Sequence, residues 1–313
     1  MPRQLRIEYE GAIYHIMNRG NRGDIIFKDD IDREKFLTTL GEACSKSGWQ
    51  VHAYCLMNNH FHLVIETPRP TLVTGMKWLL GTYSQRFNIR HQQKGHLFAG
   101  RYKSLLVDES DNCYLRTVCD YVHLNPVRAH LLKEGESLQN YQWSSFGIYL
   151  MPPQKRPLWV RIDRLFGEHG ITEDNALGRQ IFAALMNQRI SEQDGDEALY
   201  KIIKHGWKIG AMNFIERLHE KIHHQEKNGN HFPSAINESE EVRGRKLIEE
   251  QLDKLQITLQ DLKKLPCTNP KKITIAQYLR LNTTLSLTWI AHELKAGTPG
   301  TLANSLNNKK CNI

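Results

Sequence analysis

The chain has 313 residues, enough for two domains, and 40% of them are hydrophobic and 9% aromatic, so packed cores are feasible. No stretch approaches the roughly 18 consecutive apolar residues of a membrane span, and the charged residues 1–10 lack the apolar part of a secretory signal. The six cysteines form neither a CxxC pair nor a spacing typical of disulfides, which favours reduced thiols in a cytoplasmic protein.

Positive charge is concentrated at the end of the chain. The formal net charge is +8, and residues 262–313 contain 8 lysines and arginines against 1 acidic residue. Residues 1–150 contain 18 basic against 15 acidic residues, and residues 151–261 contain 16 against 18. A basic terminal segment suits contact with nucleic-acid phosphates, although a solvated tail would have the same composition.

Apolar periodicity predicts alternating strands and helices in the first half of the chain. In chain order we expect a strand over 11–19, a helix from about 29 to 47, strands over 49–57 and 60–66, a helix over 72–87, a strand within 97–107 and a helix over 112–123. Asn58-Asn59 is a turn signal that predicts a hairpin, and Asn125-Pro126 should end the last helix. This order predicts an α+β fold, a ferredoxin-like or RRM-like antiparallel sheet covered by helices.

The rest of the chain is predicted to be a helical C-terminal extension. Residues 151–261 form a helical extension or linker, and residues 262–313 form a unit similar to a helix-turn-helix. In that unit Gly297 suits a helix end, Thr298 an N-cap and Pro299 the first helical turn. The helix from Pro299 would enter the major groove of DNA, whereas a small helical packing module would show the same pattern. The expected domains are therefore 1–150, 151–261 and 262–313.

Two histidines on the third predicted strand are candidates for a metal site. His60 and His62 flank Phe61, and residues two apart on a strand point to the same face. Both imidazoles can then hold one ion, while Phe61 points to the opposite face, where a packed helix would bury it. Two surface histidines on a half-exposed strand would give the same spacing.

Tyr121 and Asn125 lie four residues apart on the last predicted helix and so share one face. If this helix packs on the face of the histidines, Asn125 can supply a third ligand and Tyr121 lies next to the metal. The alternative is a half-buried tyrosine with a helix-capping asparagine. Neither Asp120 nor His123 has the spacing that would share the face of Tyr121, so the sequence identifies no general base.

These residues carry a resemblance to a known family. Residues 59–62 (NHFH) resemble the HUH signature, in which two histidines flank a bulky hydrophobic residue. Residues 119–129 (CDYVHLNPVRA) resemble the tyrosine helix of the REP-associated tyrosine transposases, single-tyrosine relatives of the transposases of small bacterial insertion sequences. Further similar segments occur in the family's order at residues 11–16, 95–103 and 141–145.

The resemblance covers residues 1 to about 150. The chain departs from it at Asn58, where relatives often have proline, and in everything after residue 150, which the core family does not require. The expected fold of residues 1–150 is therefore the HUH transposase domain, followed by the helical extension.

The resemblance implies a transposase-like enzyme that cuts single-stranded DNA at hairpin-associated sites. His60, His62 and Asn125 would hold Mg²⁺ or Mn²⁺, and Tyr121 would attack the phosphate to give a 5′-phosphotyrosine bond. The ligand types alone leave zinc and copper open. Four cations near the motifs are expected to contact phosphates: Arg19, Arg101, Lys103 and Arg128.

The partners implied are single-stranded or hairpin DNA, and duplex DNA through the C-terminal unit. We expect a cytoplasmic, nucleoid-associated protein with no membrane partner, and the oligomeric state stays open. One rival is a catalytically silent DNA- or RNA-binding module of the same fold, against which the joint presence of four site residues argues. Another is a metallohydrolase that activates water and needs no tyrosine.

Overall fold

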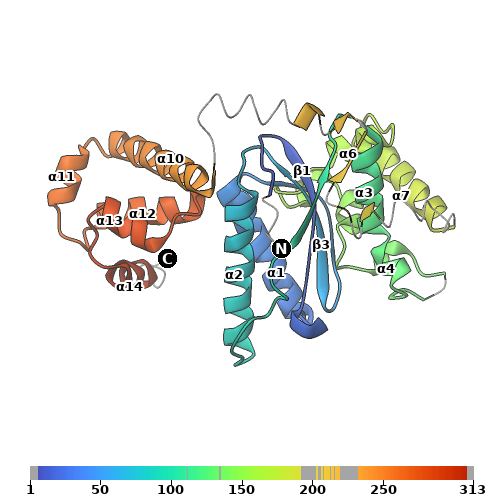
Figure 1. Ribbon diagram of the computed structural model, residues 1–313, viewed down its shortest axis with the longest axis horizontal. Helices are drawn as coiled ribbons and strands as arrows, with labels where there is room; N and C mark the ends of the chain where they lie inside the picture. Colours follow the sequence, from blue (N-terminus) through green and yellow to red (C-terminus); the bar gives the residue numbers. More distant parts are fainter. Residues whose placement is uncertain are drawn as a thin grey trace. The chain divides into compact units, whose positions relative to one another are not determined.

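The computed structural model describes residues 6–110, 112–133, 135–191, 202–203, 206, 208–211, 213–214, 216–218 and 232–308. Contacts divide the chain into an N-terminal unit that ends at Ile222 and a C-terminal unit that begins at His223 (Figure 1). Each unit has its own core of buried apolar side chains. No helix among the described residues is long and apolar enough to cross a membrane.

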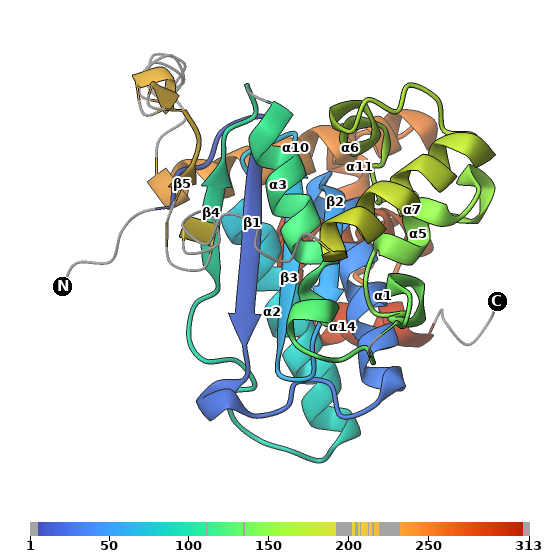
Figure 2. The ribbon, with the colours of Figure 1, turned by 90° about the vertical axis from the view of Figure 1, so that its right-hand side faces the viewer.

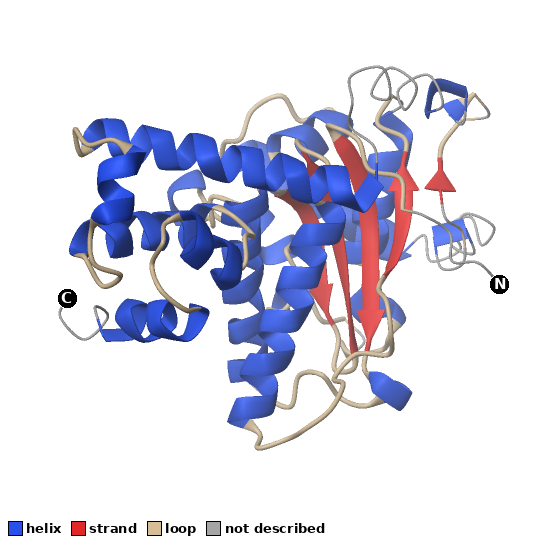
Figure 3. Ribbon diagram, turned by 60° about the vertical axis from the view of Figure 1, so that its left-hand side comes forward, coloured by secondary structure: helices blue, strands red, loops and turns tan. Residues whose placement is uncertain are grey.

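The N-terminal unit is an α+β domain built on a five-stranded sheet in the order β2-β3-β1-β4-β5. The strands are β1 (Ala12–Arg19), β2 (Gln50–Leu56), β3 (His60–Thr67), β4 (Lys103–Val107) and β5 (Lys208–Ile209). The first four pair antiparallel in the ferredoxin-like order, as the sequence predicts, and β5 adds a short parallel edge strand that the sequence did not predict. Figure 3 shows the sheet in red, with helices against it.

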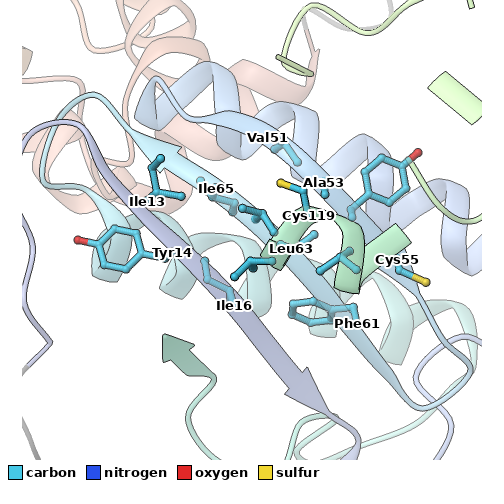
Figure 4. Packing of buried hydrophobic residues seen from close by; sticks show 14 of the residues in the cluster. Ile13, Tyr14, Ile16, Val51, Ala53, Cys55, Phe61, Leu63, Ile65 and Cys119 are labelled. Atoms are coloured by element: carbon cyan, nitrogen blue, oxygen red, sulfur yellow. The ribbon is translucent and has the colours of Figure 1, made fainter. Parts of the chain in front are cut away.

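Helices cover both faces of this sheet. Helices α1 (Asp30–Ser47) and α2 (Leu72–Arg90) lie behind the strands in Figure 2, and α3 (Asn112–His123) crosses in front of them. On the α1 and α2 face, the Phe61 ring packs 4.9 Å from that of Phe36, which confirms the expected direction of Phe61. Figure 4 shows Phe61 in the cluster of buried apolar residues, with Leu63 and Ile65 farther along β3.

Four further helices follow α3 among the described residues of the N-terminal unit. They are α4 (Asn125–Arg128), α5 (Phe146–Leu150), α6 (Asp163–Glu168) and α7 (Ala176–Ser191), with 3-10 turns at Asn21–Gly23, Leu138–Asn140 and Pro153–Lys155. The chain between these helices also covers the outer edge of β2. The backbone N–H groups of Leu56 and Val51 donate to the carbonyls of Trp143 and Trp159, 2.9 Å away in both cases. The sheet edge therefore depends on residues after the last strand of the ferredoxin-like core.

The C-terminal unit is a set of helices around one core. They are α10 (Phe232–Lys254), α11 (Leu259–Lys264), α12 (Pro270–Asn282), α13 (Leu287–Glu293) and α14 (Pro299–Asn308). The expected cap is confirmed, because the Thr298 hydroxyl accepts from the backbone N–H of Thr301 at 3.1 Å. Leu302 and Leu306 of α14 are buried in this core. Ile248 and Leu252 of α10, from the segment 151–261, lie in the same core, and the division into three independent domains stays a prediction.

Candidate active site

His60 and His62 lie on one face of β3, opposite to Phe61. Their ring centroids are 5.1 Å apart. In the pairing of β3 with β1, His62 lies opposite Met17 and His60 opposite Arg19. The expected shared face is therefore present, and it is the face on which α3 packs.

A hydrogen bond holds the Nδ1 atom of each histidine. His60 Nδ1 lies 2.7 Å from Asn59 Oδ1, and His62 Nδ1 lies 3.0 Å from Nε2 of His15 on β1. An amide oxygen only accepts, so His60 carries its proton on Nδ1 and presents an Nε2 lone pair. Burial lowers the pKa of His60, and it lowers the pKa of His15 to about 4, so both rings are neutral at pH 7.

The turn before His60 contains Asn58, where relatives often have proline. Its backbone carbonyl accepts from the N–H groups of Ile26 and Phe27, at 3.0 and 3.2 Å. Its side-chain oxygen accepts from the Arg33 guanidinium at 2.7 Å. The asparagine thus ties the hairpin turn to the start of α1, a link that a proline side chain could not make.

Tyr121 lies beside the histidines. Its ring centroid is 5.9 Å from those of His62 and His15, edge-on to both, and the side chain is only 4% exposed. The Arg128 guanidinium lies 4.8 Å from the tyrosine ring and also donates to the Tyr121 carbonyl at 3.2 Å. The structure therefore brings the phenol, both histidines and one predicted phosphate-binding cation together.

Asn125 starts α4 rather than continuing α3. Helix α3 ends at His123, and Pro126, which has no N–H to donate, stands in the first turn of α4. The Asn125 side chain is 8% exposed and donates through Nδ2 to the Tyr121 carbonyl at 3.1 Å. Among the contacts described for this part of the chain, none joins the Asn125 amide to His60 or His62. Its place as a third ligand stays a prediction.

The predicted cations differ in their position relative to the histidines. Arg19 pairs with His60, and Lys103 pairs with Met17, which in turn pairs with His62. Directly paired residues point to the same face, so Arg19 and Lys103 share the face of the histidines. Arg101 is exposed in the segment before β4.

The sequence neighbours of Tyr121 point into other parts of the unit. His123 is fully buried, its Nε2 lies 2.8 Å from the Ser145 hydroxyl, and burial lowers its pKa to about 4. The Asp120 carboxylate pairs with His169 at 3.0 Å and with Arg189 at 2.8 Å. Both residues have structural partners away from the phenol, in agreement with the spacing argument.

The residues present fit a divalent cation held by imidazole and amide ligands. Each histidine is fixed through Nδ1, which leaves Nε2 as the atom that would bind the ion, a common arrangement of metal-binding histidines. Within the described ranges, no group of three or more His, Cys, Asp and Glu could hold a metal by itself. The Asn125 amide stays the predicted third ligand.

His15 was not among the residues predicted for the site. The one signal in the sequence was a polar residue in an otherwise apolar strand segment, Ala12–Ile16. Alternation puts His15 on a definite face of β1, but only the pairing of β1 with β3 puts that face beside His62.

Comparisons with known proteins bear on this site. A family model described as "Transposase IS200 like" matches residues 8–125. A solved structure described as "Structure of the REP associates tyrosine transposase bound to a REP hairpin" is 14% identical, with a TM-score of 0.40, and the match covers 47% of this chain and 84% of that chain. The curated proteins contain no match.

The family match begins before β1 and ends at Asn125, so all four predicted catalytic and metal-binding residues lie inside it. The order of strands and helices over that span is the one that the sequence resemblance implied. Over residues 8–125, this chain is similar to the IS200-like transposases.

Proposed function

We propose that the N-terminal unit is a metal-dependent endonuclease and strand transferase for single-stranded DNA, with Tyr121 as the nucleophile. The observation that carries the proposal is the position of the Tyr121 ring, edge-on to His62 on the face shared by both histidines. The resemblance of residues 119–129 to the tyrosine helix of REP-associated transposases supports a hairpin-associated substrate.

The chemistry follows from the groups present. His60, His62 and Asn125 would hold Mg²⁺ or Mn²⁺, which when bound would polarise the scissile phosphate. The Tyr121 oxygen attacks phosphorus, the bond to the 3′ oxygen breaks, and that oxygen leaves as a 3′-hydroxyl. The 5′-phosphotyrosine bond keeps the phosphodiester energy, so attack by another 3′-hydroxyl restores the phenol and joins strands.

Three cations would hold the DNA backbone near this site. Arg19 and Lys103 share the histidine face, and Arg128 lies over the Tyr121 ring. A phosphate between them would lie beside the phenol. Arg101 would contact DNA farther along the strand. Phosphate contacts of this kind position the substrate but do not select its sequence.

The test compares Tyr121→Phe with Tyr114→Phe, a partly buried tyrosine on the same helix. Each is incubated with hairpin oligonucleotides that carry single-stranded flanks, with Mg²⁺, and covalent adducts are resolved by denaturing electrophoresis. We expect adducts with the wild type and Tyr114→Phe, and none with Tyr121→Phe, whose DNA affinity should stay unchanged. Cleavage by Tyr121→Phe would favour the water-activating hydrolase, and binding without cleavage by the wild type would favour the silent module.

We further propose that the C-terminal unit binds duplex DNA through α14. The exposed face of this helix has uncharged polar residues, Asn304 and Asn307 among them, and asparagine can read base edges in the major groove. The exposed Lys271 and Lys295 on neighbouring segments of the unit would supply phosphate contacts. A base-reading helix flanked by cations is typical of helix-turn-helix units.

A further inference from the structure

His15 is a buried histidine that contacts a proposed metal ligand. Its side chain is 2% exposed and that of His62 is 3% exposed. Nε2 of His15 lies 3.0 Å from Nδ1 of His62, and the two rings are stacked with centroids 5.2 Å apart and planes only 7° from parallel. A buried polar ring usually needs a hydrogen-bond partner, and here each ring supplies one to the other.

Strand pairing fixes this arrangement. His15 lies opposite Val64 on β3 and Leu105 on β4, whose side chains form no hydrogen bonds. His62 is diagonal to it, two residues along β3 on the same face. The nearest polar side chain across the strand pair is therefore the one that is proposed to bind metal.

The direction of this hydrogen bond decides whether His62 can be a ligand. If His15 donates from Nε2, His62 accepts at Nδ1 and carries its own proton on Nε2, where it blocks a metal ion. If His62 donates from Nδ1, His15 accepts, and His62 has a lone pair on Nε2 for the ion. A bound cation favours the second state.

We propose that His15 is a positioning residue for His62, which fixes the ring angle of His62 and accepts its Nδ1 proton so that Nε2 faces the metal. This inference rests on the proposed metal site. It gives His15 the same task that the Asn59 side chain performs for His60. Loss of such a partner typically weakens metal binding about 10- to 100-fold.

The test uses two variants of the full chain that differ only in hydrogen bonding. His15→Gln puts an amide oxygen near the position of Nε2, whereas His15→Met has a similar shape but accepts only weakly. Mn²⁺ affinity is measured by the loss of the free-ion EPR signal. We expect His15→Met to bind Mn²⁺ about 10- to 100-fold more weakly, and His15→Gln to recover most of that loss.

Two outcomes would overturn the proposal: wild-type affinity in His15→Met, or an equal loss in both variants, which would indicate packing alone. His60→Ala distinguishes failure of the His15 proposal from failure of the proposed metal site. Equal Mn²⁺ binding by His60→Ala and the wild type would mean that the metal site itself is wrong.

Nitrogen-15 NMR of the histidine rings is a second test, and it uses the wild-type protein, so it does not depend on the folding of a variant. With Mg²⁺ added, His62 should carry its proton on Nδ1, and a proton on Nε2 would refute the inference.

Discussion

Arg128 contacts the proposed nucleophile at two points, the ring and the backbone carbonyl of Tyr121. A guanidinium can do both at once because it is planar and has several donors, whereas a lysine ammonium is a compact charge. Arg128 therefore restrains both the ring and the helix end that carries it.

We expect Arg128→Lys to keep DNA affinity, because the positive charge stays. Cleavage should slow about 2- to 5-fold, which corresponds to the free energy of an exposed cation–π contact. Single-turnover cleavage of a hairpin oligonucleotide measures the rate, and fluorescence anisotropy measures affinity. Arg101→Lys is the control, because Arg101 is exposed in the segment before β4. Equal rates for the two variants would show that Arg128 acts only as a positive charge.

His123 links acidity to the stability of the N-terminal unit. Its pKa in the folded chain is about 4, below the ordinary value of about 6.5, because burial disfavours the charged ring. The unfolded chain therefore binds the extra proton first as the pH falls. The stability that neutral His123 contributes is complete above about pH 6.5 and is lost progressively down to about pH 4.

The free energy of unfolding should decrease less steeply with falling pH in His123→Gln than in the wild type. We expect the slope to differ by up to about 1.4 kcal/mol per pH unit across this window. The glutamine amide can still donate to the Ser145 hydroxyl but has no proton to take up. Urea unfolding at a series of pH values measures the slope. His130→Gln, at an exposed position, is the control, and equal slopes for both variants would contradict the assignment.

Elements differ in how much of their role the sequence can predict. The alternation in His60–Glu66 predicted both the strand and the face of its histidines, because side-chain direction follows directly from strand geometry. The position of His15 could not be predicted, since it depends on the register between strands 47 residues apart. Likewise, the helical extension expected over residues 151–261 did not show which core its helices would join.

Lys272 on α12 shows how one buried side chain organises the C-terminal helices. It is fully buried, and its ammonium donates to the carbonyl of Lys295 at 2.7 Å and to that of Lys263 at 3.5 Å. Lys295 belongs to the turn between α13 and α14 and has a positive φ of 45°. The lysine thus ties the end of α11 to the turn that precedes the proposed recognition helix.

We expect Lys272→Met to destabilise this unit by about 1–3 kcal/mol, because the stem is kept but the part-buried Lys295 carbonyl loses its donor. Hydrogen exchange of the amides of residues 294–298 should speed up, as detected by mass spectrometry. Lys271→Met changes an exposed neighbour and should leave the exchange unaltered. Identical exchange in both variants would mean that the turn does not depend on Lys272.

At the scale of the whole molecule, we propose that the two units have different functions. The N-terminal unit cleaves single-stranded DNA, and the C-terminal unit adds affinity for duplex DNA. The sequence pattern favoured a unit starting near residue 262, but its core also includes Ile248 and Leu252 of α10. A cut near Pro270 would expose these apolar side chains. Residue 222, where the N-terminal unit ends, is the better place to divide the chain.

We expect a chain ending at residue 222 to cut a short hairpin but to bind a duplex-flanked hairpin more weakly. Each lost phosphate contact should flatten the dependence of log affinity on log salt by about 0.9. Lys295→Gln in the full chain should remove one such contact while keeping the core. Binding across a salt series measures the slope, and identical slopes for all three proteins would favour the packing module.

The covered edge of β2 has a consequence for handling the domain in isolation. Backbone groups of Val51, Tyr54 and Leu56 are bonded to residues 143–145 and 159–161, well beyond the family match. Removal of those segments would leave unpaired backbone N–H and C=O groups along the edge of β2. Such an open strand edge can pair with another chain and so promotes aggregation. A fragment cut at residue 125 or 150 should therefore self-associate, whereas one that ends at residue 222, and so keeps these segments and β5, should stay monodisperse in light scattering.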